Sequence, residues 1–392
     1  MPEPRPLRLA VVTRRYPPLI GGAERLMSYL ADALADAGAD VTVLTSAAPG
    51  LPAGIVPTGR GNLNLERLAT STARFVGTWR YMANLRRRLR RGRFDLAYVS
   101  MLKHDAYAAL GVARRIGMPV VLRPEGAGVT GDLAWQAWGR GGRAIGRRCR
   151  QADAFVAISP AIRLELLGAG YDPSRIIDLP NGVPVPASPW QRRADWQEMP
   201  MAAFVGRLAP EKGLSTLIEA WPAVLAARPG ARLVLVGEGP ERPALATLIA
   251  RLGLFQSVSM PGPSDDPSAI LRRVDVFVLP SIEEGMSLAL LEAMALGVPV
   301  IASAIPGNAA LISDGTHGRL APPGNPAAWS AALLSQWADP AAAEIQAHAA
   351  RSRVIDRYSI TAVARRHLEL FGRLVGARGD SPRADSPHVG FG

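Results

Sequence analysis

Two glutamates, Glu284 and Glu292, lie in a mostly apolar stretch that runs from Pro280 to Ser303 and also contains Glu283. We expect Glu284 in a turn between a strand at 276–279 and a helix at 287–296, followed by a strand at 298–302. Open α/β sheets bind their ligands at such turns, beyond the carboxyl ends of the strands. Glu292 would lie about two turns along the helix, so that both carboxylates point toward one crevice. The alternative is that Glu292 is an exposed residue of a helix that buries its leucines.

The residues that follow Glu284 complete the same turn and are Gly285, Met286 and Ser287. Gly285 has no side chain, which lets the backbone come close to a bound molecule. Charged residues are seldom fully buried without a partner, and the run around Glu284 and Glu292 is almost wholly apolar. This contrast favours a functional site over an exposed helix surface.

A second turn carries two cations, Arg207 and Lys212, within the sequence Val-Gly-Arg-Leu-Ala-Pro-Glu-Lys-Gly at 205–213. Arg207 offers a planar fork of donors and Lys212 a compact charge, and both suit a diphosphate. Only two lysines occur in the chain, Lys103 and Lys212. The alternative is a solvated loop with two surface cations.

A third turn contains Gly21 and Gly22, which follow the first expected strand and open a helix. Backbone amides at a helix N-terminus can bind a phosphate, although a tight turn without a ligand explains the pair equally well. Glu238 lies in Val-Gly-Glu-Gly-Pro at 236–240, at the end of another expected strand.

The glutamate pair resembles the donor site of the family 4 retaining glycosyltransferases, which have the GT-B fold. The resemblance rests on Pro-Ser-x-x-Glu-Gly at 280–285, the seven-residue spacing before Glu292, and Ala-Met-Ala-x-Gly-x-Pro-Val-Ile-Ala-Ser at 293–303. Weaker similarity extends from Gly21 to about Val375. The resemblance implies that Arg207 and Lys212 contact the donor diphosphate, as does the Gly21-Gly22 loop. It further implies that Glu292 binds the ribose hydroxyls, that Glu284 lies near the transferred sugar, and that Glu238 lies beside the nucleobase.

The first half departs from the family pattern at Glu125. Many members carry a histidine that contacts the donor sugar after the strand that here ends in Leu-Arg-Pro-Glu-Gly-Ala-Gly at 122–128. Glu125 lies near that position. His104, which follows Lys103 and the preceding strand, could supply a proton carrier to the same crevice, although a lone histidine is more often structural.

An arginine-rich segment at 75–93 has apolar residues at helical spacing: Phe75, Trp79, Met82, Leu85 and Leu89. A core-facing helix with a solvated basic face explains this pattern. The density of arginine also suits an anionic membrane surface or a lipid-phosphate acceptor.

Strands and helices are expected to alternate along the chain as two doubly wound, Rossmann-like α/β domains that face a shared cleft. The strands are expected at 7–13, 41–45, 96–100, 120–123, 154–158 and 176–179, then at 202–205, 233–236, 258–260, 276–279 and 298–302. We assign residues 1–183 to an acceptor-side domain, 184–200 to a linker and 201–357 to a donor domain. A helix at 358–375 should pack back on the first domain, and the tail at 376–392 should be disordered.

Length, amino-acid composition and net charge limit which classes of protein fit this chain. The chain has 392 residues, of which 48% are hydrophobic, and this suits two domains. A single cysteine, Cys149, excludes an internal disulfide and fits a reducing compartment. Without an apolar leader or a long apolar run, we expect a cytoplasmic protein, with peripheral binding to the inner face of the membrane as an option. The net charge is +12, and all of the excess lies in the first half.

These observations predict a retaining glycosyltransferase that moves a sugar from a nucleotide-sugar donor to a saccharide or lipid-linked acceptor, in polysaccharide or glycolipid synthesis. No Asp-x-Asp occurs in the sequence, so we expect neither a metal nor another cofactor. The catalytic candidates are Glu284, Arg207, Lys212, Glu125 and His104. Two alternatives are a phosphorylase-like enzyme of the same fold and a basic nucleic-acid-binding protein. The arginines lack a recognisable nucleic-acid reader motif, so nucleic acid is not an expected partner.

Overall fold

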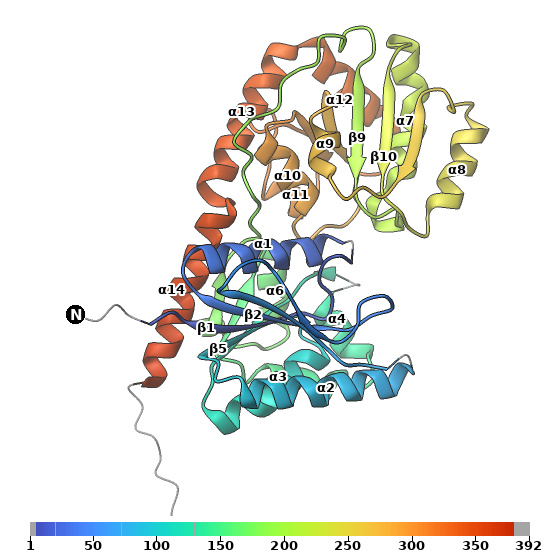
Figure 1. The fold of residues 1–392 in the computed structure, drawn as a ribbon. Coiled ribbons are helices and arrows are strands. Elements are labelled where there is room, and N and C mark those ends of the chain that lie inside the picture. Colours follow the sequence, from blue (N-terminus) through green and yellow to red (C-terminus); the bar gives the residue numbers. More distant parts are fainter. Residues whose placement is uncertain (1–4, 20, 72, 129–130, 380–392) are drawn as a thin grey trace, which may run out of the picture.

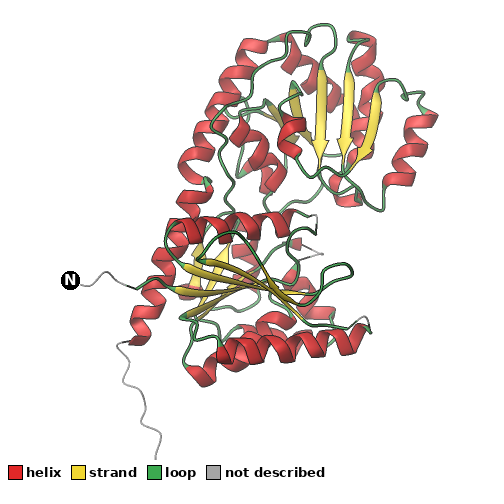
Figure 2. Cartoon of the chain, in the orientation of Figure 1, coloured by secondary structure: helices red, strands yellow, loops and turns green. Residues whose placement is uncertain are grey.

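The protein contains two parallel β-sheets, each covered by helices (Figures 1 and 2). The computed structural model describes residues 5–19, 21–71, 73–128 and 131–379. Buried apolar side chains form two clusters, one on each sheet. The predicted pair of doubly wound α/β domains is confirmed, while the exact domain limits stay predictions.

The first sheet has eight strands in the order β3-β4-β2-β1-β5-β6-β7-β8. They are β1 (Arg8–Val12), β2 (Asp40–Ser46), β3 (Gly54–Val56), β4 (Leu63–Leu68), β5 (Leu96–Ser100), β6 (Val120–Arg123), β7 (Ala154–Ala157) and β8 (Ile176–Asp178). All neighbours are parallel except β3 and β4. The sequence did not predict β3 and β4. β3 is a short edge strand of largely exposed residues, so it carries no apolar run.

Six α-helices connect these strands. They are α1 (Gly22–Asp36), α2 (Arg74–Arg91), α3 (His104–Ile116), α4 (Asp132–Trp138), α5 (Gly142–Cys149) and α6 (Pro160–Gly168). α2 and α3 pack together on the side of the sheet away from the second domain, whereas α1 lies on the side toward it (Figure 1). Leu26, Leu30 and Leu34 of α1 are buried, as their helical spacing predicted.

The second sheet has six parallel strands in the order β11-β10-β9-β12-β13-β14. The strands are β9 (Met201–Val205), β10 (Arg232–Val236), β11 (Val258–Gly262), β12 (Val276–Leu279), β13 (Val300–Ser303) and β14 (Arg319–Ala321). The helices are α7 (Leu214–Ala227), α8 (Arg242–Arg251), α9 (Pro267–Leu271), α10 (Leu288–Leu296), α11 (Pro306–Ala309), α12 (Pro326–Ala338) and α13 (Pro340–Arg357). The three-residue β14 was not predicted.

The connection at 184–200 contains no helix or strand and is anchored to the second domain. Trp190 is buried there, and its indole Nε1 donates to the carbonyl oxygen of Val274 over 2.7 Å. Arg193 pairs with the fully buried Asp275 at 3.0 Å. A charge buried in this way needs its partner, so these contacts hold the connection against the sheet.

The last helix, α14 (Ile360–Gly379), returns to the first domain beside α1 (Figure 1). The Tyr98 hydroxyl on β5 lies 3.2 Å from Nε2 of His367, and the Tyr98 ring packs against Phe371. Burial lowers the pKa of His367 to about 4, so the imidazole is neutral at pH 7. α14 continues past Val375, which corrects the expected start of the tail at Gly376. Residues 380–392 lie outside the described residues.

Candidate active site

The topology brings four loops to the junction between the domains. β1 lies between β2 and β5, and β9 lies between β10 and β12, so each sheet changes winding direction at its first strand. In open α/β sheets the ligand crevice forms at this switch point, beyond the carboxyl ends of the strands. The loops that leave these strands contain the residues singled out in the sequence: Gly21 and Gly22 after β1, Lys103 and His104 after β5, Arg207 and Lys212 after β9, and Glu284 and Gly285 after β12.

Three glycines lie where the two domains meet. A Cβ added to Gly285 would lie 3.9 Å from the backbone nitrogen of Ala127, and one added to Gly22 would lie 4.0 Å from Cβ of Leu288. A Cβ on Gly128 would collide with the carboxylate of Glu283. The loops after β1 and β6 therefore face the turn after β12.

The turns after β9 and β12 are locked to each other. The backbone amide of Ile282 donates to the carbonyl oxygen of Glu211 over 2.8 Å. Gly213 adopts the left-handed conformation, with φ 59°, directly against the carbonyl oxygen of Pro280. No side chain fits there, because a Cβ would overlap that oxygen. The backbone thus fixes the distance between the two predicted groups of site residues.

This lock places Lys212 and Glu284 in direct contact. Nζ of Lys212 lies 2.5 Å from Oε1 of Glu284, and the Ser281 hydroxyl donates to the same oxygen over 2.9 Å. The Lys212 side chain is 20% exposed and that of Glu284 is 10% exposed. A charge-assisted bond in such a partly buried place is stronger than a surface ion pair.

Arg207 and Glu238 flank this pair on neighbouring turns. Arg207 is exposed, and so is Glu238, whose carboxylate lies 3.5 Å from Arg242. The two turns are joined by the amide of Leu208, which donates to the carbonyl oxygen of Glu238 over 3.0 Å. Arg207 therefore projects into solvent from the same turn that carries Lys212.

Ser287 and Met286 have local structural roles. Ser287 is the N-cap of α10, and its hydroxyl accepts from the amide of Leu290 over 3.3 Å. Met286 is partly buried against the second core. Their predicted part in donor binding stays a prediction.

Glu292 is directed at the first domain and has a separate set of partners from Glu284. Its Oε1 lies 2.7 Å from Nη2 of Arg25 and accepts from the Tyr29 hydroxyl over 3.0 Å. Burial raises the pKa of Glu292, and the charge of Arg25 and the Tyr29 hydrogen bond oppose that rise. The sequence did not identify Arg25 or Tyr29, since only the folded chain brings α1 to α10.

Gly21 and Gly22 open α1 as predicted, but a carboxylate of the chain lies at the helix start. Gly21 is the N-cap, and a Cβ on it would collide with the side chain of Glu24. Glu24 is buried and pairs with Arg15 at 3.1 Å. An acidic side chain in the first helical turn is favourable, because it faces the positive end of the helix dipole.

Glu125 lies in a network of buried polar groups. It accepts a short hydrogen bond from the Ser100 hydroxyl, and its amide donates to Oδ2 of Asp132 over 2.8 Å. The buried Arg123 lies 3.7 Å from its carboxylate and donates to Oδ1 of Asn181 over 2.8 Å. Burial raises the pKa of Glu125, and Arg123 opposes the rise. Arg123 and Asp132 were not predicted, because nothing in the local sequence signals their burial.

His104 and Lys103 lie against an aromatic side chain of α4. The His104 ring meets the Trp135 ring edge-on, with centroids 5.3 Å apart, and Nζ of Lys103 lies 5.6 Å above Trp135. Lys103 also pairs with Asp132 at 3.4 Å. Burial lowers the pKa of His104, and the positive charges of Arg14 and Lys103 lower it further. Lys103 and Asp132 thus join His104 to the network around Glu125.

Within 5–19, 21–71, 73–128 and 131–379, no group of three His, Cys, Asp or Glu side chains is placed to hold a metal ion. In the same part of the chain, no helix has both the length and the apolar character needed to cross a membrane.

Known proteins resemble both halves of the chain. The model of the family described as Glycosyltransferase Family 4 matches residues 20–185, and that described as Glycosyl transferases group 1 matches residues 200–339. The glycogen synthase of Mycobacterium tuberculosis is 27% identical over an alignment of 405 residues, gaps included. The alignment covers 95% of this chain and 96% of that protein. The phosphatidyl-myo-inositol mannosyltransferase of Mycobacterium leprae is 27% identical over 364 residues, covering 90% and 92% of the two chains.

Solved structures share the fold. Sucrose-phosphate synthase from Thermosynechococcus elongatus has a TM-score of 0.79 and 22% identity, covering 95% of this chain and all of that one. HepE from Anabaena, solved in complex with UDP-glucose, has a TM-score of 0.75 and 18% identity, covering 93% of this chain and 99% of that one. These likenesses confirm the predicted GT-B arrangement.

The lock between the two turns can be tested at Gly213. Gly213→Ala should lower the free energy of unfolding by about 3 kcal/mol, since it adds a clash with Pro280 to the cost of a left-handed backbone. The matched control is Gly315→Ala, where φ is 73° and an added Cβ meets no atom within 4 Å. This control should cost only about 1 kcal/mol. Equal losses in urea unfolding of the two variants would show that the turns are not locked.

Proposed function

Because this chain belongs to the family 4 glycosyltransferases, we propose that it transfers a sugar from a nucleotide-sugar donor to a saccharide or lipid-linked acceptor, with retention of the anomeric configuration. One observation carries the proposal. The partly buried pair of Lys212 and Glu284 lies at the switch point of the second sheet, opposite the Gly21-Gly22 helix start of the first. A ligand at this junction would meet a cation and a carboxylate from the second domain and the amides of a helix start from the first.

The donor is proposed to bind through its diphosphate. Arg207 and Lys212 would contact the phosphates, because one offers a planar fork and the other a mobile point charge. Glu284 would face the transferred sugar, Glu292 the ribose and Glu238 the base. HepE has been solved with UDP-glucose, which supports a nucleotide sugar as the donor class here.

Catalysis in this proposal is mainly electrostatic. The bond between the anomeric carbon and the donor phosphate oxygen breaks, and negative charge develops on the leaving diphosphate. Lys212 and Arg207 stabilise that charge, and such preorganised stabilisation is usually the largest catalytic contribution. The acceptor oxygen bonds to the anomeric carbon on the same face, and its proton passes to the leaving phosphate. The positive charge near the phosphates then comes from Lys212 and Arg207.

The acceptor is proposed to approach from the first domain. Glu125 lies on the loop after β6 and His104 is the first residue of α3, both at the carboxyl edge of the sheet. Lys103 adds a cation next to the half-buried Trp135 ring. His104 is neutral at pH 7, since burial lowers its pKa, so it could accept a hydrogen bond from a sugar hydroxyl. This arrangement suits a polyhydroxylated or anionic acceptor.

A membrane surface is proposed as the setting for a lipid-linked acceptor. The buried stripe of α2 consists of Tyr81, Leu85 and Leu89, whereas Trp79 is 70% exposed. This corrects the expected stripe, in which Trp79 faced the core; the side chain of Phe75 lies outside the described residues. Exposed Trp79 and Val76 next to exposed arginines form an amphipathic surface, which suits the interface of an anionic bilayer.

The diphosphate assignment can be tested by substitution. Arg207→Ala and Lys212→Ala should each lower turnover of the nucleotide sugar about 100-fold or more, because each removes charge stabilisation from the leaving group. Arg251→Ala, at an exposed arginine of the same domain, is the matched control and should keep normal turnover. Near-normal turnover in a folded Arg207 or Lys212 variant would remove that residue from the site. Consumption of free phosphate in place of the nucleotide sugar would favour a phosphorylase-like enzyme.

The membrane assignment can be tested with the exposed arginines of α2. Replacing Arg87, Arg90 and Arg91 with Gln should reduce sedimentation with phosphatidylserine liposomes, since each basic residue near the surface contributes about 1 kcal/mol. The loss should be clearest at low salt, because salt screens this attraction. The control replaces Arg251, Arg273 and Arg357 of the second domain, which are exposed too. If the α2 variant sediments as before, or if both variants lose sedimentation equally, α2 is a solvated helix that does not bind the membrane.

A further inference from the structure

Three side chains from two domains converge between α1 and α10. Nη2 of Arg25 donates to the Tyr29 hydroxyl over 2.7 Å and lies 2.7 Å from Oε1 of Glu292, and the Tyr29 hydroxyl donates to that Oε1 over 3.0 Å. Arg25 and Tyr29 are one helical turn apart on α1, so they share a face of the helix. Glu292 therefore receives both donors at a single oxygen.

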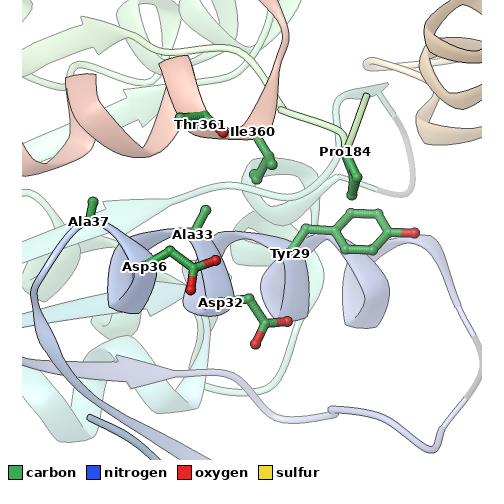
Figure 3. Close-up of a pocket in the computed structure, with 8 residues that line it drawn as sticks. All are labelled: Tyr29, Asp32, Ala33, Asp36, Ala37, Pro184, Ile360 and Thr361. Carbon is green, nitrogen blue, oxygen red and sulfur yellow. The ribbon is translucent and has the colours of Figure 1, made fainter. Parts of the chain in front are cut away.

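The contact between α1 and α10 brings these side chains together. α1 buries Leu26, Leu30 and Leu34 against its own sheet, which turns Arg25 and Tyr29 toward the second domain. Tyr29 and Pro184 line a pocket of 290 Å³. In Figure 3 the Tyr29 hydroxyl is directed away from Asp32 and Asp36. Glu292 is the only charged residue of α10. The rest of α10 is apolar, and most of it is buried.

The charge on Glu292 depends on these partners. Its side chain is 12% exposed, and burial alone favours the protonated carboxyl group. The guanidinium of Arg25 is the main influence that opposes this. The pKa of Tyr29 is raised to about 12, so Tyr29 remains a neutral hydroxyl that can donate at physiological pH. Removing Arg25 would thus leave a buried carboxylate with only a neutral donor.

We propose that Arg25 and Tyr29 are positioning residues that hold Glu292 ionised and oriented for the ribose hydroxyls of the donor nucleotide. Both contacts are to Oε1, which leaves Oε2 outside the triad to accept a ribose hydroxyl. Nucleotide recognition by the second domain would then require α1 of the first. The inference rests on the proposed nucleotide-sugar donor and adds the residues on which its recognition depends.

The test measures nucleotide binding by isothermal titration calorimetry with UDP, GDP and ADP, which share the ribose diphosphate. The nucleotide that binds the unmodified protein is then titrated into Arg25→Gln at pH 8 and pH 6. Loss of Arg25 raises the pKa of Glu292 further, so the variant protonates this carboxyl group at a higher pH than the unmodified protein does. The affinity should fall little at pH 8 and about tenfold at pH 6, where more of the carboxyl group of the variant is protonated.

A double-mutant cycle separates positioning from a merely structural effect. In a Glu292→Gln background, Arg25→Gln should cost almost no further affinity, because its effect passes through the missing carboxylate. Tyr29→Phe, which keeps the ring, should weaken binding about threefold and provides a second variant if Arg25→Gln does not fold. Arg25→Lys should restore most of the affinity at pH 6. Arg163→Gln is the control of equal charge change: it removes the Arg163–Asp178 pair of the first domain and the hydrogen bond from Arg163 to the carbonyl oxygen of Ile176.

The outcomes separate a failure of the proposed function from a failure of the positioning role. If none of the three nucleotides binds the unmodified protein or Arg163→Gln, the proposed function fails. If a nucleotide binds but Arg25→Gln and Tyr29→Phe bind it normally, the positioning role is overturned. The positioning role is also overturned if Arg25→Gln loses the same nucleotide affinity at both pH values and in both the unmodified and the Glu292→Gln backgrounds.

Discussion

The ion pair between Lys212 and Glu284 depends on the backbone lock between two turns, and the arrangement of the junction follows from that lock. Gly213 permits the turn after β9 to lie against Pro280, and the amide of Ile282 ties the turn after β12 to Glu211. The fixed backbone of the two turns holds the side chains of Lys212 and Glu284 next to each other. A site fixed by strand ends is more exact than one built on free loops. The proposed diphosphate site inherits this rigidity.

Four carboxylates at the junction each have a basic partner of their own. Glu284 pairs with Lys212, Glu292 with Arg25, Glu24 with Arg15, and Glu125 lies beside Arg123. Pairing of this kind limits the cost of burying charge. It also means that an incoming phosphate would find Lys212 already paired and would have to share it with Glu284 or take that carboxylate's place. The proposed mechanism therefore predicts rearranged side chains on donor binding, within a fixed backbone.

The sequence predicted those parts of the structure that local pattern determines. The buried strands β5, β6 and β12 match their expected limits, because continuous apolar runs bounded by turns are a strong signal. The turn with Glu284 was predicted for the same reason. The Arg25–Glu292 pair was not, since it joins two helices far apart in the chain, and no local pattern reports such a contact. Trp79 was expected in the core from its spacing, yet the buried stripe begins at Tyr81, which only packing against α3 and the sheet decides.

The most direct test of the account is a crystal structure of the protein with a bound nucleoside diphosphate. The account predicts the diphosphate within hydrogen-bond distance of Lys212 and Arg207, with the ribose at Glu292 and the Gly21-Gly22 helix start facing the phosphates. The turns around Gly213 and Pro280 should keep their backbone. A nucleotide bound away from this junction, with the Lys212–Glu284 pair undisturbed, would contradict it.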